Sequence, residues 1–177
     1  LEWDEKLKLR DKKTLSKYSK KLEEEVTFYK YIQYLFSEQW HKLKEYANKK
    51  GISIVGDIPI YVALDSADTW ANPELFQLDK NLNPVAVAGC PPDSFSEDGQ
   101  LWGNPLYDWE YHKYTNYKWW IKRIKYCYNL YDIVRIDHFR GFDEYFSIPY
   151  KSKTAVNGTW EKGPGIELFR RLKEELG

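Results

Sequence analysis

The sequence has 177 residues, which is enough for one domain with a hydrophobic core. It carries 27 basic and 27 acidic residues, so the formal net charge is zero and nothing in it favours nucleic acid or an anionic membrane as a partner. No apolar run approaches the roughly 20 residues of a membrane span and no signal peptide is present, so we expect a soluble, cytoplasmic protein.

Aromatic residues are frequent, at 18% of the sequence, with 8 Trp and 15 Tyr. They suit stacking on sugar rings, but they suit an ordinary core equally well. Cys90 and Cys127 have the spacing of neither metal ligands nor a disulfide framework, so we expect reduced thiols, with Cys127 in the core. Met is absent, even at position 1, so we expect an internal fragment of a longer protein.

The amino-terminal part contains one long amphipathic helix. Residues 1–21 are a charged lead-in, expected either as an exposed helix or as a poorly ordered segment. Over 22–50 apolar residues recur at steps of three and four, and Gly51 ends the pattern. These residues are Leu22, Val26, Tyr29, Ile32, Phe36, Trp40, Leu43 and Ala47. The spacing favours a stripe buried in a core over a binding surface.

A β-branched run over 52–63 predicts a buried strand that completes a helix–strand region beginning at residue 22. Gly56 and Pro59 interrupt the run, which indicates a shaped loop near Asp57.

Residues 64–108 form an excursion from this regular structure. Within it, 75–79 and 84–89 predict a small hairpin, and a segment rich in Gly, Pro, Asp and Ser follows. Excursions of this length are often binding loops.

Residues 109–177 return to regular structure. The pattern predicts a helix over 108–131, a strand that begins at Asp132 and carries Arg135 and Asp137, a short strand over 143–149, a loop over 158–165 and a helix over 164–176. Alternating helices and strands predict an α/β fold with a parallel sheet.

Polar side chains gather where the two main strands end. Arg135 and Asp137 share one face of the second strand because strand side chains alternate, and the cation favours an ionised Asp137. Asp57 and Tyr61 follow the first strand, and His138 follows the second. In parallel α/β folds sites lie at the carboxyl ends of strands, so we expect a functional site here. An ordinary Arg–Asp ion pair is the alternative.

Several other kinds of site are disfavoured. No Gly-rich loop joins a strand to a helix, and no G-x-S-x-G motif is present. His41, His112 and His138 are too scattered for a metal motif, and the first two fall on predicted helices.

Three segments carry a specific resemblance: VRIDHFRGF, GDIPIYVALDSADTWANPELFQ and PPDSFSEDGQLWGNPLYDW. They resemble the amylomaltases, the bacterial 4-α-glucanotransferases (disproportionating enzymes) of the α-amylase superfamily, and the likeness runs from about Leu22 to the last residue. It implies the middle of a (β/α)8 TIM barrel, with 52–62 and 132–139 as its third and fourth strands and 64–108 as an inserted subdomain. It also implies a retaining transglycosylase of starch or glycogen metabolism, which moves α-1,4-glucan segments between maltooligosaccharides and needs no cofactor or metal.

The resemblance implies roles for the residues at the strand ends. Asp137 would be the nucleophile that forms a covalent glycosyl-enzyme, and Arg135 would keep its carboxylate ionised. His138 would hydrogen-bond the sugar beside the scissile bond. Asp57 and Tyr61 would support them from the neighbouring strand.

The excursion would contribute further substrate contacts. Trp102 would be a sugar-stacking platform with Asn104 beside it, and Phe95 would lie in a loop that covers the glucan. Many relatives carry Tyr at the position of Ser94, so that aromatic contact is missing here.

The retaining mechanism also needs an acid/base carboxylate, which in this family is a Glu in an AEDLG-like motif that does not occur here. Asp143 and Glu144 are expected to be structural. We therefore expect no transferase activity from this chain alone. The alternatives are a weak glucan-binding module, acting through Trp102, Phe95 and Tyr61, or a structural scaffold. The expected partners are the rest of the barrel or a second copy of the chain.

Overall fold

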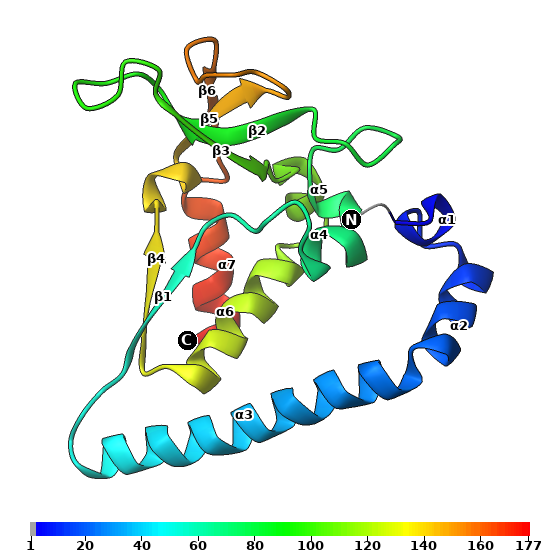
Figure 1. The fold of residues 1–177 in the computed structure, drawn as a ribbon. Coiled ribbons are helices and arrows are strands. Elements are labelled where there is room, and N and C mark those ends of the chain that lie inside the picture. The colour runs from blue at the N-terminus through cyan, green and yellow to red at the C-terminus, as the bar shows by residue number, and fades with distance from the viewer. Residues whose placement is uncertain (1–2) are drawn as a thin grey trace. The chain divides into compact units, whose positions relative to one another are not determined.

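The computed structural model describes residues 3–177 (Figure 1). It divides into two compact units. The first comprises the chain up to Gly56 together with Asn129–Ile133, and the second comprises Asp57–Tyr128 and Val134–Gly177. In the described part of the chain, no helix is both long enough and apolar enough to cross a membrane.

The first unit is mainly helical and contains α1 (Glu5–Lys8), α2 (Lys12–Lys21) and α3 (Glu23–Lys49). Asp4 and Asp11 cap the first two helices by accepting hydrogen bonds from backbone N–H groups. Of the two alternatives for residues 1–21, the structure has the exposed helical one, divided into two helices, whereas residues 1–2 lie outside the described residues. The long helix expected over 22–50 is confirmed as α3.

The burial expected for the apolar stripe of α3 is wrong for this chain. No side chain of α3 is buried, and Phe36 and Leu43 are 58% and 53% exposed. Amphipathic spacing marks a face that is suited to burial, but it does not supply the surface that covers it. Within the first unit, Trp40, Lys44 and Asn48 of the carboxyl-terminal half of α3 make hydrogen bonds to the 129–132 segment.

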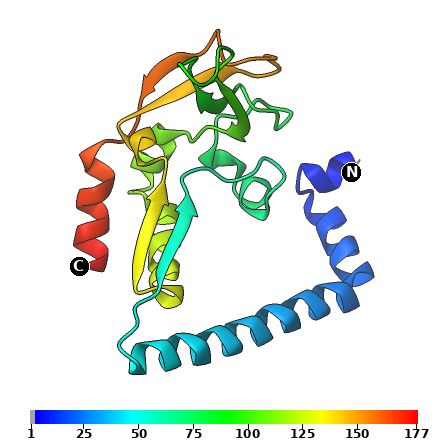
Figure 2. The same cartoon turned by 60° about the vertical axis from the view of Figure 1, so that its left-hand side comes forward.

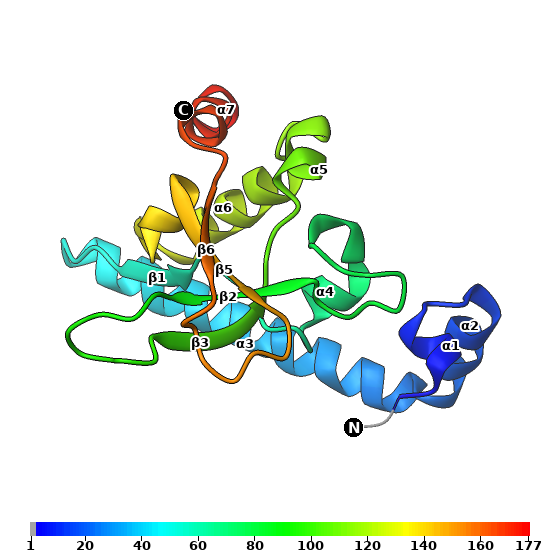
Figure 3. The same cartoon turned by 90° about the horizontal axis from the view of Figure 1, so that it is seen from above.

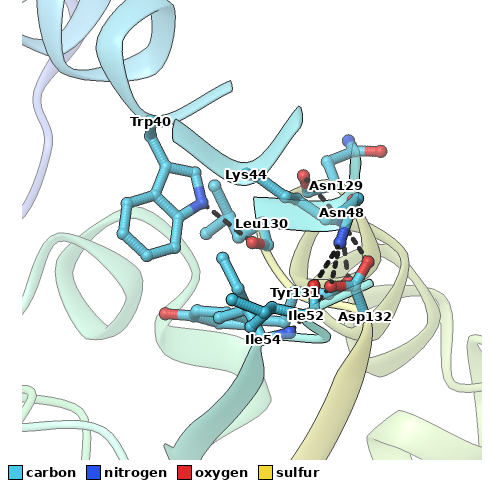
Figure 4. A network of polar contacts seen from close by, with 9 residues as sticks. All are labelled: Trp40, Lys44, Asn48, Ile52, Ile54, Asn129, Leu130, Tyr131 and Asp132. Atoms are coloured by element: carbon cyan, nitrogen blue, oxygen red, sulfur yellow. Dashed lines mark hydrogen bonds and ion pairs between the residues drawn. The ribbon is translucent and has the colours of Figure 1, made fainter. Parts of the chain in front are cut away.

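The carboxyl-terminal half of α3 takes part in a polar network centred on Asp132 (Figure 4). The Asp132 carboxylate accepts hydrogen bonds from the backbone N–H of Ile54 and from Nδ2 of Asn48, both at 2.8 Å. Lys44 Nζ lies 3.6 Å from the same carboxylate and donates to the Tyr131 carbonyl at 3.0 Å. The network therefore joins the end of α3 to the residues that precede the strands.

Two strands, β1 (Val55–Pro59) and β4 (Ile133–Asp137), form a two-stranded sheet, and their arrows point the same way in Figure 2. The strands expected over 52–63 and from Asp132 onward are confirmed, the first over a shorter range. The burial expected for the first strand is wrong, because its residues alternate between exposed and buried and Val55 is 60% exposed. Gly56 lies inside β1, and the position requires glycine because a Cβ there would lie only 2.0 Å from the Tyr131 ring.

The second unit contains a four-stranded antiparallel sheet, with strand order β3-β2-β5-β6 (Figure 3). Its strands are β2 (Ala86–Cys90), β3 (Gln100–Pro105), β5 (Glu144–Pro149) and β6 (Thr159–Lys162). The short strand expected over 143–149 is confirmed as β5. Because these four strands are antiparallel, the expectation of a parallel sheet fits only the pair of β1 and β4.

Two expectations in this unit need correction. The hairpin predicted between 75–79 and 84–89 is confirmed only near its turn, where Leu78 bridges Pro84 and the backbone N–H groups of Asp79 and Val85 donate to the carbonyls of Asn83 and Gln77. Beyond it, β2 pairs with β3 and β5 instead. The loop predicted over 158–165 contains β6, whose four residues are all exposed. An edge strand with no buried face leaves no alternation of apolar and polar residues to detect.

The helices of the second unit are α4 (Ala67–Ala71), α5 (Trp109–Tyr114), α6 (Lys118–Leu130) and α7 (Ile166–Leu176), with short 3-10 turns η1 (Pro73–Leu75) and η2 (Phe139–Phe142). The single helix expected over 108–131 is broken between α5 and α6, where Asn116 and Tyr117 have left-handed φ values of 52° and 55°. The last helix is confirmed as α7.

An aromatic core fills the space beside these helices. Its most deeply buried side chains include Tyr107, His112, Trp120, Phe142 and Leu168. Cys127 is buried at 6% exposure, as expected, and both cysteines are free thiols.

Candidate functional site

The carboxyl halves of β1 and β4 are joined by an ion pair between Asp57 and Arg135. Arg135 Nε donates to Asp57 Oδ1 at 2.9 Å, and Nη2 donates to Oδ2. The expected partner was Asp137, two residues along the same strand. Paired strands lie about 4.8 Å apart, whereas alternate residues of one strand are roughly 6.6 Å apart, so the neighbouring strand offers the nearer carboxylate.

The pair fixes the charges at this sheet edge. The hydrogen bonds from Arg135 lower the pKa of Asp57. Asp57 in turn raises the pKa of Arg135, first through the hydrogen bonds and then through its charge, and the charge of Asp137 adds a smaller contribution. Arg135 is thus a permanent cation whose field reaches both carboxylates.

Asp137, the last residue of β4, differs from Asp57. Its side chain is exposed, and within residues 3–177 no hydrogen bond or salt bridge of its carboxylate is found. The carboxylate is therefore accessible to solvent, and its oxygen lone pairs are not used by the described residues.

His138 follows Asp137 in a left-handed conformation, with φ 54° and ψ 44°. Its Nε2 is buried without a hydrogen-bond partner among the described residues. Burial lowers the pKa of His138, and the charge of Asp137 opposes this only in part, so the ring is neutral at pH 7. Gly141 leaves room for the ring, because a Cβ there would lie 3.1 Å from His138 Cδ2 and 2.9 Å from Ile60 Cδ1.

Three rings gather beside these charges, and we call Tyr61, Trp102 and His138 the aromatic cluster. The ring centroids of Trp102 and His138 are 4.8 Å apart, and Tyr61 lies 6.3 Å from each. Tyr61 is buried, whereas Trp102 is 37% exposed and so offers a surface to a ligand. The cluster brings a residue from the 64–108 excursion to the ends of both strands.

The other two residues expected from the excursion are placed differently. Asn104 Nδ2 donates to the Val62 carbonyl at 2.9 Å, so this side chain ties β3 to the segment after β1. Phe95 is 95% exposed, at the tip of a turn in which Asp93 accepts hydrogen bonds from the backbone N–H of Phe95 and Ser96. Phe95 makes no ring contact with the aromatic cluster among the described residues.

Two nearby acidic residues have structural surroundings. Glu144 pairs with Arg140 at 3.4 Å on an exposed surface, and the Asp143 carbonyl accepts from the backbone of Gly163. Within residues 3–177 no group of three or more His, Cys, Asp or Glu side chains could hold a metal ion.

The sequence patterns missed two residues that hold the end of β1. Tyr107 Oη donates to the Ile60 carbonyl at 2.7 Å, and Arg123 donates to the carbonyls of Pro59 and Ile60. For Arg123 the sequence did contain a sign of this role, because a cation stands on α6 next to the apolar positions Trp120 and Ile124, which are buried.

Comparison with known proteins decides the family. A sequence profile described as 4-alpha-glucanotransferase matches residues 1–177. The chain belongs to the 4-alpha-glucanotransferase family. The resemblance inferred from the sequence motifs is thereby confirmed.

Individual family members match almost the whole chain. The 4-alpha-glucanotransferase of Clostridium butyricum is 56% identical over 176 residues, which is 99% of this chain and 36% of the relative. The enzyme of Aquifex aeolicus is 52% identical over 171 residues, covering 97% of this chain and 35% of the relative. The chain therefore spans little more than a third of the length of these curated relatives.

A solved structure matches the fold. The amylomaltase from Streptococcus agalactiae, in complex with acarbose, superposes with a TM-score of 0.97 at 50% identity, covering 99% of this chain and 36% of that one. The α/β fold of the chain is therefore that of the corresponding part of an amylomaltase.

Proposed function

We propose that the protein containing this chain is a 4-α-glucanotransferase, which transfers α-1,4-glucan segments between maltooligosaccharides. The single observation that carries the proposal is Asp137, an exposed carboxylate at the end of β4 that has no hydrogen bond or salt bridge to the described residues and lies two residues from the cation Arg135. The family membership of the whole chain supports the same reaction.

In the proposed retaining mechanism Asp137 attacks the anomeric carbon and forms a covalent glycosyl-enzyme. Arg135 lies two residues away on the same strand and is held in place by Asp57. Its positive charge interacts with the negative charge of Asp137. Asp57 thus acts on the nucleophile only through Arg135.

The aromatic cluster is the proposed sugar-binding surface. The partly exposed ring of Trp102 suits stacking on a glucose ring, and the buried ring of Tyr61 lies 6.3 Å from it. His138, whose buried Nε2 has no hydrogen-bond partner among the described residues, is the proposed contact of a hydroxyl on the sugar beside the scissile bond. Asn104 keeps β3 beside the end of β1, and Phe95 is the proposed contact of a loop that covers the glucan.

The architecture proposed for the whole protein is a (β/α)8 barrel in which β1 and β4 are neighbouring strands and 64–108 is an inserted subdomain. A cavity of about 470 Å³ between α6, β4 and α7 is lined by apolar side chains that include Ile124, Val134 and Leu172. We propose that the rest of the barrel covers such surfaces. We also place the protein in the cytoplasm, where free thiols such as Cys90 and Cys127 persist.

Catalysis by this route needs a second carboxylate as acid/base, roughly 5 Å from the nucleophile. Glu144, the nearest Glu in sequence, is engaged with Arg140. We therefore propose that the 177-residue chain alone is inactive and that the acid/base belongs to another part of the protein.

The test is incubation with maltotriose, followed by chromatography of the products. The complete protein should yield glucose and longer oligosaccharides, its Asp137→Asn variant should not, and the 177-residue chain should yield nothing. Product formation by the isolated chain would disprove its proposed inactivity. An inert complete protein would disprove the transferase function.

A second candidate function is glucan binding without chemistry, which is favoured by the exposure of Trp102 and Phe95. Titration of the chain with maltoheptaose, followed by Trp fluorescence, examines it. A response that is lost in Trp102→Ala and kept in Asp137→Asn would support a binding module. No response in any variant would leave a purely structural role for this chain.

A further inference from the structure

Arg123 lies on α6, half-buried among aromatic rings. Its guanidinium carbon is 5.3 Å from the ring centroid of Trp119 and 5.0 Å from that of Trp120. Stacking against two rings restricts the guanidinium plane and directs its N–H groups to one side.

That side faces the end of β1. Arg123 Nη2 donates to the Pro59 carbonyl at 2.6 Å, and Nη1 donates to the Ile60 carbonyl at 3.0 Å. The Ile60 carbonyl also accepts from Tyr107 Oη at 2.7 Å. These carbonyls belong to the last residue of β1 and the residue after it, so one side chain of α6 fixes the point at which the chain leaves the sheet.

The next residue is Tyr61, which belongs to the aromatic cluster. Its ring stacks on Tyr107 with centroids 6.0 Å apart and an interplanar angle of 20°. Tyr61 is therefore held from two directions: its backbone through the carbonyl of Ile60, and its ring through Tyr107. The backbone contact and the ring contact are linked, because Arg123 Nη1 also lies 3.4 Å from Oη of Tyr107, the residue on which the Tyr61 ring stacks.

We propose that Arg123 is a positioning residue that sets the orientation of Tyr61 and, through Tyr61, the geometry of the aromatic cluster. The effect on glucan binding rests on the proposed function, whereas the effect on ring geometry does not. A planar fork with several donors can hold two successive carbonyls at once, which a lysine ammonium on a flexible stem does poorly. Arg123→Lys should therefore restore the charge but only part of the geometry.

The first measurement is a carbon–proton correlation spectrum of the histidine rings in the 177-residue chain, which contains only three histidines. His138 lies edge-on to Trp102 at 88°, so its ring signal reports the cluster directly. In Arg123→Gln the His138 signal should move toward its random-coil position, and in Arg123→Lys it should move part of the way. The matched control, Lys125→Gln, removes one exposed cation from the same helix and should leave the signal in place.

The other two histidines separate positioning from unfolding. His112 is fully buried in the aromatic core, and His41 is exposed on α3. A dispersed His112 signal shows that the variant is folded, and an unchanged His41 signal shows that the first unit is intact. An unmoved His138 signal in folded Arg123→Gln overturns the proposal. If Arg123→Gln unfolds, the His138 signal is compared between Arg123→Lys and the original chain. An unchanged His138 signal in Arg123→Lys then overturns the proposal.

The second measurement is the affinity for maltoheptaose, followed by Trp fluorescence. Arg123→Gln should bind roughly threefold to tenfold more weakly than the original chain, the loss expected when a stacking surface is misplaced. Binding equal to that of the original chain, with His138 displaced, would disprove the link to the ligand while leaving the proposed function intact. If neither the original chain nor any variant binds, the second candidate function, glucan binding by this chain, fails, and the His138 signal alone decides the role of Arg123.

Discussion

One aspartate lies at each end of β4: Asp132 precedes the strand and Asp137 is its last residue. The contacts of these two carboxylates are different. Asp132, before β4, is bonded to Ile54 and Asn48 and lies near Lys44. Asp137, at the end of β4, has no such bond in the described part of the chain and faces solvent. A carboxylate whose lone pairs are taken up by the protein holds structure, whereas one left open beside a cation can react with a ligand.

The same contrast appears in the glycines. Gly56 gives space to the Tyr131 ring near the amino end of the pair, and Gly141 gives space to the His138 ring near the carboxyl end. The first contact serves packing and the second serves the candidate site. Equivalent substitutions at the two ends should therefore change different properties.

The largest expected effect is on activity. Asp137→Asn in the complete protein should lower the rate of maltotriose disproportionation by at least about 10⁴-fold, because the amide cannot form the glycosyl-enzyme. Its thermal unfolding should be nearly unchanged, since Asp137 makes no hydrogen bond or salt bridge within residues 3–177. Substantial residual activity of Asp137→Asn would contradict the claim that Asp137, unlike Asp132, takes part in the reaction.

The next effect concerns pH and the aromatic core. Burial lowers the pKa of His112 to about 4, and its ring nitrogens have no partner among the described residues. His112 therefore binds a proton more readily in the unfolded state than in the folded state. The free energy of unfolding is not reduced by this group above about pH 6.5, and it decreases as the pH falls toward 4. The loss should reach about 3 kcal/mol.

Urea unfolding at several pH values measures this loss, with His112→Phe as the variant that lacks the titrating group. A His112→Phe protein with the same pH dependence as the original would show that another group is responsible.

The glycine pair should separate stability from binding. Gly56→Ala should destabilise the fold by about 1–3 kcal/mol, because the new methyl group overlaps the Tyr131 ring. Glucan affinity of the folded fraction should stay the same. Gly141→Ala should weaken glucan binding by roughly tenfold through displacement of His138, at a smaller cost in stability. Equal effects of the two variants on binding would remove the distinction between the ends.

The smallest effect is expected at Asp132. Asp132→Asn keeps an acceptor for Ile54 but loses the charge that attracts Lys44. The urea midpoint should fall slightly and the glucan affinity should not change. Loss of binding with a normal midpoint would show that the amino end also contributes to the site.

Sequence reasoning reached the features that depend on local pattern. Helical periodicity located α3 and α7, and strand alternation placed Arg135 and Asp137 on one face of β4. The resemblance in the motifs then led to the family that the profile comparison establishes.

What the sequence could not provide depends on partners far along the chain. Arg135 binds Asp57, 78 residues away, because strand pairing brings that carboxylate closest. Arg123 reaches carbonyls 63 and 64 residues away, and backbone carbonyls carry no signature in a sequence. The exposure of α3 was missed because periodicity describes a face and not what covers it.

The central claim is that the open carboxylate of Asp137 is the nucleophile, and the most direct measurement is mass spectrometry of a trapped intermediate. The complete protein would be mixed with α-maltotriosyl fluoride, whose leaving group needs no acid catalyst, then quenched in acid and digested. We predict a maltotriosyl group on Asp137 and none in the Asp137→Asn variant. A glycosyl group on any other carboxylate, such as Asp57 or Asp132, would contradict the account.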